Sequence, residues 1–300
     1  MPNPTAATRV AGVVGWPIEH SLSPTIHNAA YRALGLDWSY VAFPVTPEDF
    51  PAAIDGLRAA GLAGVNVTLP HKEAAAAAAT ALSEDAERLR AANVLTFAGE
   101  IAGDNTDCLG FSRFLADDPG VDPTGRSALL FGAGGAGRAC ALALARGGLD
   151  HLAVAVREPA RAAALRSALE GLPTRVELVE LGADLSPFDL VVNATPVGQG
   201  GESLPLPGLH AGQIVVDLIY RPALTPLVEE ARAAGAQAYG GLGLLLHQAA
   251  LTIERWTGQV APLSVMSAAA LAELAEDPKQ GFETESPRSM LTIAPEGPLA

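Results

Sequence analysis

The fold of this chain is decided by one stretch near its middle, Ser127-Ala-Leu-Leu-Phe131 followed directly by Gly132-Ala-Gly134-Gly135-Ala136-Gly137. The apolar run predicts a buried strand, and an apolar helix over 135–146 should follow the glycines. The glycines permit a tight turn and let a pyrophosphate approach the backbone and the helix N-terminus. The stretch predicts a dinucleotide-binding unit, although the same pattern also suits a tight strand-to-helix turn without a ligand.

Strands and helices alternate on both sides of this turn. On its N-terminal side the expected strands cover 9–14, 39–43, 64–69, 94–97 and 100–102, and the helices 23–34, 48–60 and 70–80. On its C-terminal side the strands cover 128–131, 152–156, 175–178, 190–193, 214–217 and 237–239, and the helices 135–146, 159–169, 226–234, 244–256 and 262–274. Strands 94–97 and 100–102 should form a hairpin. This alternation predicts an α/β fold of parallel sheets covered by helices.

The charge balance narrows the possible partners. Nineteen Lys and Arg against 33 Asp and Glu give a net charge of −14, which argues against a nucleic-acid-binding face or an anionic membrane surface. The two cysteines, Cys108 and Cys140, lack metal-ligand spacing and should be small, reduced packing residues. The N-terminus lacks the features of a signal peptide, and no apolar run reaches the ~20 residues of a membrane span. We therefore expect a cytoplasmic protein.

The end of the next predicted strand bears on the cofactor. NAD-binding proteins usually have an acidic residue there for the ribose 2′-hydroxyl, whereas NADP-binding proteins have Arg near the 2′-phosphate. The sequence at this point is Val156-Arg157-Glu158-Pro-Ala-Arg161. Two arginines four residues apart can share a helix face and bind a phosphate, while Glu158 favours the ribose diol. The balance favours NADP and leaves NAD possible, and an ordinary solvated charge is the alternative for Arg161.

Candidates for acid–base chemistry lie upstream of the glycine-rich turn. Lys72 falls near the start of a helix that is predicted to follow a strand, at the strand end where open α/β sheets bind ligands. An ordinary solvated lysine is the alternative for this residue. Asp107 closes the polar segment Gly103-Asp-Asn-Thr-Asp107, for which a turn or N-cap role is the alternative. Thr68 and Asn93 could equally be a β-forming residue and a turn residue.

A segment near the N-terminus, Gly15-Trp-Pro-Ile-Glu-His-Ser21-Leu-Ser23, carries two hydroxyl groups. Alternate residues of an extended segment face the same way, so Ser21 and Ser23 could meet one ligand. Ser23 precedes a proline and could also be the N-cap of the helix that follows. We assign no metal site, because no ligand spacing connects the histidines His20, His27 and His71.

Taken in order along the chain, these motifs resemble those of the shikimate dehydrogenase family, from about residue 9 to 275. The family's segments correspond here to 15–28, 66–72, 105–107, 132–139, 193–198, 217–226 and 241–250. The resemblance departs at one strand end, where the family usually has Asn-Arg-Thr and this chain has Val156-Arg157-Glu158.

The resemblance implies a role for each matching residue. The catalytic residues that flank the reacting hydroxyl would be Lys72 and Asp107. The residues that bind the substrate would be Ser21, Ser23 and Tyr220 for its carboxylate, and Thr68, Asn93 and Gln248 for its ring hydroxyls. Those that bind NADP would be Gly132, Gly134, Gly135, Ala136, Gly137, Arg157, Arg161, Thr195, Leu218 and Gly241.

The resemblance also implies a reaction and an architecture. The reaction would be the reversible NADP-linked reduction of 3-dehydroshikimate to shikimate, in the shikimate pathway of aromatic amino-acid biosynthesis. An N-terminal α/β substrate domain, residues 1–110 plus 242–276, would face a Rossmann-type doubly wound NADP-binding domain, residues 111–241, across a cleft. The Pro-, Gly- and Asp-rich stretch 117–125 agrees with a boundary in or just before it. Residues 277–300 would be a flexible tail, and the protein would be a monomer or a homodimer.

Other functions stay open on the sequence. A quinate/shikimate dehydrogenase or an aminoshikimate dehydrogenase acts on a ring that differs by one substituent, and Glu158 favours the NAD-linked quinate option. A folate-linked dehydrogenase of related layout is disfavoured by Ser21-Leu-Ser23. A non-catalytic nucleotide-sensing protein on the same fold belongs to a different class, and the presence of Lys72 and Asp107 argues against it.

Overall fold

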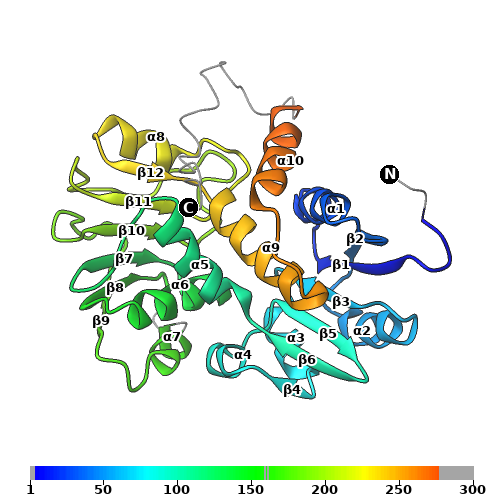
Figure 1. Ribbon diagram of the computed structural model, residues 1–300. Coiled ribbons are helices and arrows are strands. Elements are labelled where there is room, and N and C mark those ends of the chain that lie inside the picture. Colours follow the sequence, from blue (N-terminus) through cyan, green and yellow to red (C-terminus); the bar gives the residue numbers. More distant parts are fainter. Residues whose placement is uncertain (1–3, 159, 161, 277–300) are drawn as a thin grey trace, which may run out of the picture.

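The computed structural model describes residues 4–158, 160 and 162–276, which form two sheets flanked by helices (Figure 1). The first sheet contains β1 (Arg9–Gly15), β2 (Trp38–Pro44), β3 (Gly64–Val67), β4 (Ala81–Leu82), β5 (Val94–Ala98) and β6 (Glu100–Asp104). The second sheet contains β7 (Ser127–Phe131), β8 (His151–Ala155), β9 (Arg175–Val179), β10 (Leu190–Asn193), β11 (Ile214–Asp217) and β12 (Gln237–Tyr239).

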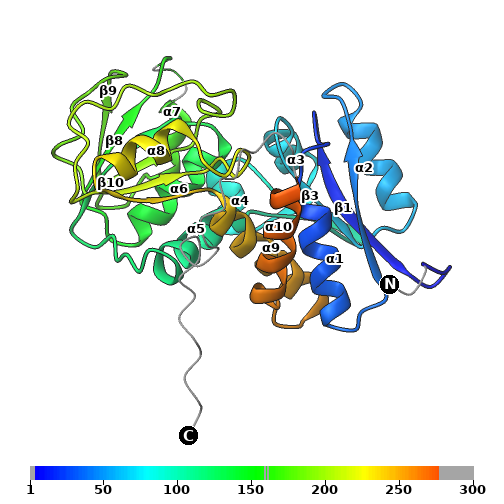
Figure 2. The same ribbon diagram turned by 90° about the horizontal axis from the view of Figure 1, so that it is seen from above.

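The helices connect the strands and close the chain. They are α1 (Ser23–Ala33), α2 (Phe50–Ala59), α3 (Lys72–Ala78), α4 (Glu84–Leu89), α5 (Thr106–Asp117), α6 (Gly135–Arg146), α7 (Ala162–Ala168), α8 (Pro226–Ala233), α9 (Leu242–Thr257) and α10 (Leu263–Glu276). After β12 the chain returns to the first sheet, where α10 packs along α1 (Figure 2). None of the helices in the described part of the chain is both long and apolar enough to cross a bilayer.

The second sheet has the strand order of a dinucleotide-binding fold. All of its strands are parallel, in the order β9-β8-β7-β10-β11-β12. Numbered along the chain from β7, this is 3-2-1-4-5-6, the doubly wound order whose ligand crevice lies where the order reverses, between the first and fourth strands. Here those strands are β7 and β10, and their nearly complete burial is typical of a sheet covered on both faces. The predicted Rossmann-type fold is therefore confirmed.

The first sheet is mixed, in the order β2-β1-β3-β5-β6-β4. β1 pairs in parallel with β2 and β3, whereas β5 runs antiparallel to both β3 and β6. The predicted hairpin is confirmed as β5 and β6, which turn at Gly99 with a φ of +84°. The carboxyl end of β3 leads through a turn into α3, which places Lys72 just beyond a parallel strand end.

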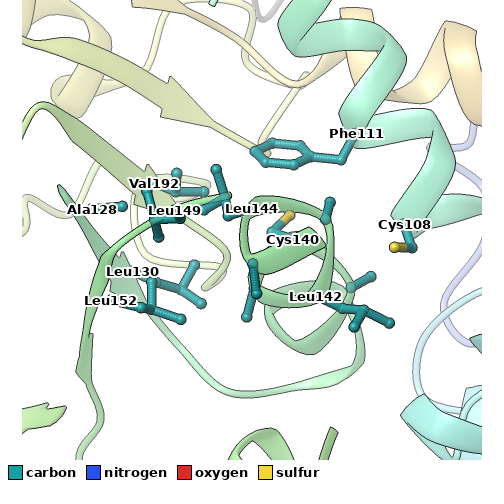
Figure 3. Packing of buried hydrophobic residues seen from close by; sticks show 14 of the residues in the cluster. Cys108, Phe111, Ala128, Leu130, Cys140, Leu142, Leu144, Leu149, Leu152 and Val192 are labelled. Carbon is teal, nitrogen blue, oxygen red and sulfur yellow. The ribbon is translucent and has the colours of Figure 1, made fainter. Parts of the chain in front are cut away.

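Small apolar residues of α6 allow the second sheet and α5 to pack closely around it (Figure 3). The cluster joins residues of three kinds of element: Cys108 and Phe111 from α5, Cys140, Leu142 and Leu144 from α6, and Ala128, Leu130, Leu152 and Val192 from the sheet. Both cysteines are free and buried, as predicted, and burial raises the pKa of both thiols. Such thiols behave as small apolar residues.

Several predicted element boundaries were wrong, and each for a local reason. α4 and α5 occupy segments where no helix was expected, because their first turns are polar; Ser83 and Asn105 cap them by accepting hydrogen bonds from the backbone. α3 begins at Lys72 and not at Pro70, because residues 68–71 form a turn in which His71 N donates to Thr68 O at 2.9 Å.

The helix α5 connects the two sheets and crosses α9 closely. The crossing depends on two glycines: a Cβ added at Gly110 would lie 3.0 Å from Gln248 Cβ, and one added at Gly243 would lie 2.4 Å from Phe114 Cδ2. The domain boundary expected between residues 110 and 111 falls within α5.

The α5–α9 crossing predicts a difference between two identical substitutions. Gly243→Ala should lower the free energy of unfolding by about 1–3 kcal/mol, because the new methyl group overlaps the buried Phe114 ring. Gly56→Ala in α2, where an added Cβ meets nothing within 4 Å, should raise it by about 0.5–1 kcal/mol. Thermal and urea unfolding of both variants measure this difference, and shifts in the same direction would contradict the close crossing.

Candidate active site

The glycine-rich turn leaves open space at the N-terminus of α6. Gly132 has a φ of +95°, which favours glycine, and a Cβ at Gly137 would lie 2.3 Å from Gly132 O. These two positions close the turn. At Gly134, by contrast, an added Cβ would meet nothing within 4 Å, so the backbone faces free space there. A helix N-terminus with its N–H groups directed into such a space suits a pyrophosphate, and the turn therefore fits a dinucleotide.

A buried hydrogen-bond network shapes the neighbouring strand end. Asn193, at the end of β10, donates to Asp217 Oδ1 at 3.0 Å and accepts from Thr195 Oγ1 at 2.7 Å. Asp217 also accepts from Thr225 Oγ1 at 2.7 Å. Burial raises the pKa of Asp217, although these hydrogen bonds oppose the shift. The network holds Thr195 beside the turn, where a Cβ added at Gly132 would lie 2.8 Å from Thr195 Cγ2.

The remaining predicted cofactor residues follow β8 and β11 or precede α9. Gly241 packs on the backbone of Leu218, because a Cβ there would lie 2.0 Å from Leu218 O. Arg157 and Glu158 follow β8 and are both exposed. Arg161 lies outside the described residues.

Lys72 and Asp107 form an ion pair. Lys72 is the first residue of α3, Asp107 lies in the first turn of α5, and Lys72 Nζ donates to Asp107 Oδ2 at 2.6 Å. The side chains are 15% and 10% exposed, so the pair is largely shielded yet open to a ligand. The N-terminus of α5 also stabilises the Asp107 carboxylate through its dipole.

Asn93 holds the Asp107 carboxylate from the side opposite Lys72. Its Nδ2 donates to Asp107 Oδ1 at 2.8 Å and to Thr106 Oγ1 at 3.0 Å, while its Oδ1 accepts from Thr106 N at 2.7 Å. The same Nδ2 lies 3.5 Å from Gln248 Oε1 on α9. Both carboxylate oxygens of Asp107 are thus engaged, and the orientation of the pair is set by buried neighbours.

The acid–base pair lies against the glycine-rich turn. A Cβ added at Gly135 would be 3.5 Å from Lys72 Cδ, an ordinary van der Waals distance, so the lysine side chain passes directly beside this position. Lys72 begins α3, which follows a strand of the first sheet, and Gly135 begins α6, which follows a strand of the second sheet. The two residues are 63 positions apart in the sequence, and the lysine and the glycine-rich turn meet at this contact. A nucleotide at the turn and a proton donor at Lys72 would share one space.

The serine-containing segment has a different backbone from the one expected. Ser21 ends a turn in which its N–H donates to Ile18 O at 3.0 Å, and Ser23 is the first residue of α1 and not its N-cap. The hydroxyl of Ser21 accepts from Ser23 N at 3.3 Å, so a turn and not an extended strand brings these residues together. Tyr220 packs against the apolar cluster beneath the same segment, and burial raises its pKa.

Thr68 lies at the inner edge of this region. A Cβ added at Gly15 would come within 2.5 Å of Thr68 Cγ2, which places the threonine directly against the start of the serine-containing segment. His71 is buried and stacks on Phe50, with its Nε2 2.8 Å from Val45 O. This histidine is therefore a packing residue.

Two further features of the sequence indicate this site. Asn66 is a polar residue within an apolar strand, and it connects Tyr40, Asn93 and Thr252 through hydrogen bonds of 2.7–3.3 Å. In addition, only two of the 19 cationic residues are lysines, Lys72 and Lys279. Arginine does not release its proton in proteins, whereas lysine can. Because lysine is rare in this arginine-rich chain, its presence at position 72 is a stronger signal than the position near a strand end alone.

A doubly wound nucleotide sheet beside a shielded lysine–carboxylate pair defines a dinucleotide-linked dehydrogenase. The family models of the shikimate dehydrogenase substrate binding domain and of the shikimate 5′-dehydrogenase C-terminal domain match residues 13–95 and 241–271. A shikimate dehydrogenase (NADP(+)) of Methanopyrus kandleri is 43% identical over 281 residues, which are 90% of this chain and 97% of that protein. The chain belongs to the shikimate dehydrogenase family, as its motifs predicted.

Solved structures agree with this assignment. The shikimate 5-dehydrogenase of Thermus thermophilus, in complex with NADP(H) and shikimate, superimposes with a TM-score of 0.80 at 39% identity, over 88% of this chain and 99% of that one. The quinate dehydrogenase of Corynebacterium glutamicum, in complex with NAD, gives a TM-score of 0.81 at 29% identity, over 88% and 99%. The fold is therefore shared by relatives that are named for different substrates and bind different cofactors.

Burial of His27 beneath the serine-containing segment predicts a dependence of stability on pH. His27 is fully buried and stacks on Tyr40, and its Nδ1 lies 2.9 Å from Ser23 O. Burial lowers the pKa of His27 from 6.5 to about 4, although the Ser23 hydrogen bond opposes the shift. The unfolded chain then binds the proton more tightly than the folded protein does. Neutral His27 therefore contributes roughly 3 kcal/mol to the free energy of unfolding above pH ~6.5, and this contribution is lost as the pH falls towards 4.

His27→Phe should remove this part of the pH dependence while keeping an aromatic ring against Tyr40. Urea unfolding at several pH values between 7.5 and 4.5, monitored by tryptophan fluorescence, measures this pH dependence. The fluorescence reports on the surroundings of His27, because Trp16, Trp38 and Trp256 all belong to the first sheet's half of the molecule. An identical loss of stability in the variant and the wild type would exclude His27 as the cause.

Proposed function

We propose that this protein is a shikimate dehydrogenase, which catalyses the reversible NADP-linked reduction of 3-dehydroshikimate to shikimate in the shikimate pathway of aromatic amino-acid biosynthesis. The observation that carries the proposal is the Lys72–Asp107 pair, 2.6 Å apart and directly beside Gly135 of the nucleotide turn. The activity for which the Methanopyrus kandleri relative is named and the ligands of the Thermus thermophilus structure support it.

The cofactor would bind at the carboxyl ends of β7 and β10, where the strand order reverses and the backbone at Gly134 faces free space. The residues that would hold NADP are Gly132, Gly134, Gly135, Ala136, Gly137, Arg157, Arg161, Thr195, Leu218 and Gly241. Bound NADP would supply or accept the hydride, and the protein contributes position and a proton route. Arg157 suits the 2′-phosphate because a guanidinium forms paired hydrogen bonds with phosphate oxygens.

Lys72 is the proposed general acid in the reduction. It would give a proton to the carbonyl oxygen of 3-dehydroshikimate as the ring carbon receives hydride, and it would take the proton back in the oxidation. Asp107 keeps the ammonium group in place, and Asn93 keeps the carboxylate in place through the 2.8 Å hydrogen bond. Closure of the surrounding elements around the substrate would exclude water.

The remaining polar residues would orient the substrate. Ser21, Ser23 and Tyr220 are proposed to bind its carboxylate, and Thr68, Asn93 and Gln248 its ring hydroxyls. The proximity of Asn93 to both Asp107 and Gln248 supports this division, because the ring hydroxyls must then lie next to the reacting one.

The proposed substrate domain consists of residues 1–110 plus 242–276, opposite a nucleotide domain of residues 111–241 and across a cleft. Packing supports this division, since α9 residues such as Leu246 and Ile253 share a buried cluster with Val13 of β1 and Ile26 of α1. The proposed flexible tail, 277–300, lies outside the described residues. We further propose a monomeric or homodimeric cytoplasmic enzyme, in keeping with two free, buried cysteines.

An NAD-linked quinate/shikimate dehydrogenase is the second candidate, favoured by one observation. Glu158 is exposed next to Arg157 at the end of β8, where a carboxylate suits a ribose diol and repels a 2′-phosphate. The structural relative that is named a quinate dehydrogenase in complex with NAD has the same fold. An aminoshikimate dehydrogenase and a non-catalytic nucleotide sensor are the remaining alternatives.

Initial rates by nicotinamide absorbance distinguish these candidates. Shikimate and quinate are each combined with NADP and with NAD, and we expect the highest kcat/KM for shikimate with NADP. In addition, Glu158→Gln should leave that value unchanged or raise it, while Arg157→Gln should raise KM for NADP about tenfold or more, since a charged hydrogen bond to the phosphate is lost. Turnover mainly with NAD or mainly of quinate would favour the second candidate, and no turnover in any combination would favour the sensor.

Substitution of Lys72 tests the proton route. Lys72→Ala should lower kcat by roughly 10²–10⁴, the usual contribution of general acid–base catalysis. Lys72→Arg should be similarly slow, because it keeps a cation beside Asp107 but cannot release a proton. Near-normal turnover of Lys72→Ala would contradict the assignment, and recovery in Lys72→Arg alone would restrict the role of the lysine to its charge.

A further inference from the structure

Two residues on the first turn of α6 contact two neighbouring residues at the start of α3. The Cβ position of Gly135 lies 3.5 Å from Lys72 Cδ, and Arg138 Nη2 donates to Glu73 Oε1 at 2.9 Å. Residues three apart share a face of a helix, so Gly135 and Arg138 form one surface directed at α3. The glycine lies beside the lysine, and the arginine holds the residue that follows it.

Stability does not account for a cation at position 138. Arg138 is only 5% exposed, whereas the Glu73 side chain is 70% exposed. It lies near the positive end of the α6 dipole, which disfavours a cation, and its Nε has no hydrogen-bond partner within the described residues. A buried guanidinium paired with one exposed carboxylate recovers only part of its desolvation cost. The residues that follow it, 139–145, are all apolar and buried, so an apolar residue would suit the site.

We infer that Arg138 is a positioning residue for the reaction. Through Glu73 it fixes α3, and with it Lys72, against the turn that would bind the cofactor. The inference rests on the proposed function, because it assigns Arg138 a task in the proton transfer by Lys72. A displacement of α3 relative to α6 changes the distance between Lys72 and the reacting oxygen, and a misplacement of about 1 Å can cost about 10²-fold in rate.

The opposite end of α6 offers a matched control. Arg146, in the last turn, pairs with Glu84 at 3.1 Å and with Asp85, both on α4. This contact also joins α6 to the first sheet's half of the molecule. Arg146 Nη1 in addition lies 4.0 Å from Cys108 Sγ on α5, but within the described residues Arg146 makes no hydrogen bond to α3, which carries Lys72. A purely structural role for Arg138 therefore predicts that neither Arg138→Met nor Arg146→Met lowers kcat.

Steady-state kinetics of the full-length enzyme test the inference first. Arg138→Met and Glu73→Gln should each lower kcat about tenfold or more, with KM for NADP and for shikimate within about twofold of the wild type. The double variant should be no slower than the slower single variant, because both substitutions remove the same contact. Arg146→Met should retain the wild-type kcat. Glu73→Gln creates no cavity and changes an exposed side chain, so it keeps the test valid should Arg138→Met fail to fold.

A second readout does not depend on turnover. Lys72 and Lys279 are the only lysines in the sequence, so brief acetylation with an N-hydroxysuccinimide ester, followed by mass spectrometry, reports both amines in one sample. The ratio of Lys72 to Lys279 modification should change severalfold in Arg138→Met and in Glu73→Gln, and stay at the wild-type value in Arg146→Met. Lys279 serves as the internal reference.

The outcomes separate the inference from the proposed function. A wild type that oxidises neither shikimate nor quinate refutes the proposed function, and the acetylation ratio still decides whether Arg138 positions Lys72. With an active wild type, an unchanged kcat and an unchanged ratio in both single variants overturn the inference. So does a rise in KM for NADP alone, which would make Arg138 a phosphate-binding residue, and so do equal effects of Arg138→Met and Arg146→Met.

Discussion

The ion pair between Lys72 and Asp107 is the interaction on which the arrangement of the site depends. The two partners lie at different strand-to-helix connections. Lys72 follows β3 at the start of α3, and Asp107 follows β6 at the start of α5. A shift of either helix would change the distance between the two charges. Because Asn93 occupies the other oxygen of Asp107, the carboxylate has little freedom to follow a displaced lysine. The pair is therefore a geometric constraint as well as an electrostatic one.

The second constraint is the close approach of helices through residues without side chains. Gly110 and Gly243 admit the crossing of α5 and α9, where an added Cβ would lie 3.0 Å from Gln248 Cβ and 2.4 Å from Phe114 Cδ2. Alanines of α6 then let the sheet and α5 pack on both of its sides. With aromatic residues at only 5% of the sequence, the molecule uses small side chains to bring elements close together, and polar residues at their ends to form the site.

Much of the fold could be predicted from the sequence because its signals are local. The run from Ser127 to Gly137 contains a buried strand, a glycine turn and a helix start, and the alternation after it predicted parallel strands covered by helices. The doubly wound order was implied by the family resemblance. The start of α5 could not be predicted in this way, because Asn105 caps the helix through a side-chain hydrogen bond that resembles an ordinary turn in sequence. The serine-containing segment was misjudged for a related reason: two alternate hydroxyls indicate an extended strand, whereas a turn before α1 brings them together.

The site residues named from family motifs require long-range contacts that no local pattern contains. The local sequence indicates a turn residue at Asn93, yet its side chain connects Asp107, Thr106 and Gln248. The local sequence indicates a single charge in an apolar helix at Arg138, yet its side chain contacts Glu73, the neighbour of Lys72. Both roles follow from tertiary packing of segments that are distant in sequence, and only a structure can supply them.

A crystal structure of the ternary complex with NADP⁺ and shikimate tests the central claim most directly. The account predicts the oxidisable ring hydroxyl within hydrogen-bond distance, about 2.6–3.2 Å, of Lys72 Nζ, with the carboxylate at Ser21, Ser23 and Tyr220 and the nicotinamide on the side of Gly135. A complex in which shikimate binds in the opposite orientation, with its carboxylate at Lys72 and its reacting hydroxyl beyond reach of the Lys72–Asp107 pair, would contradict it.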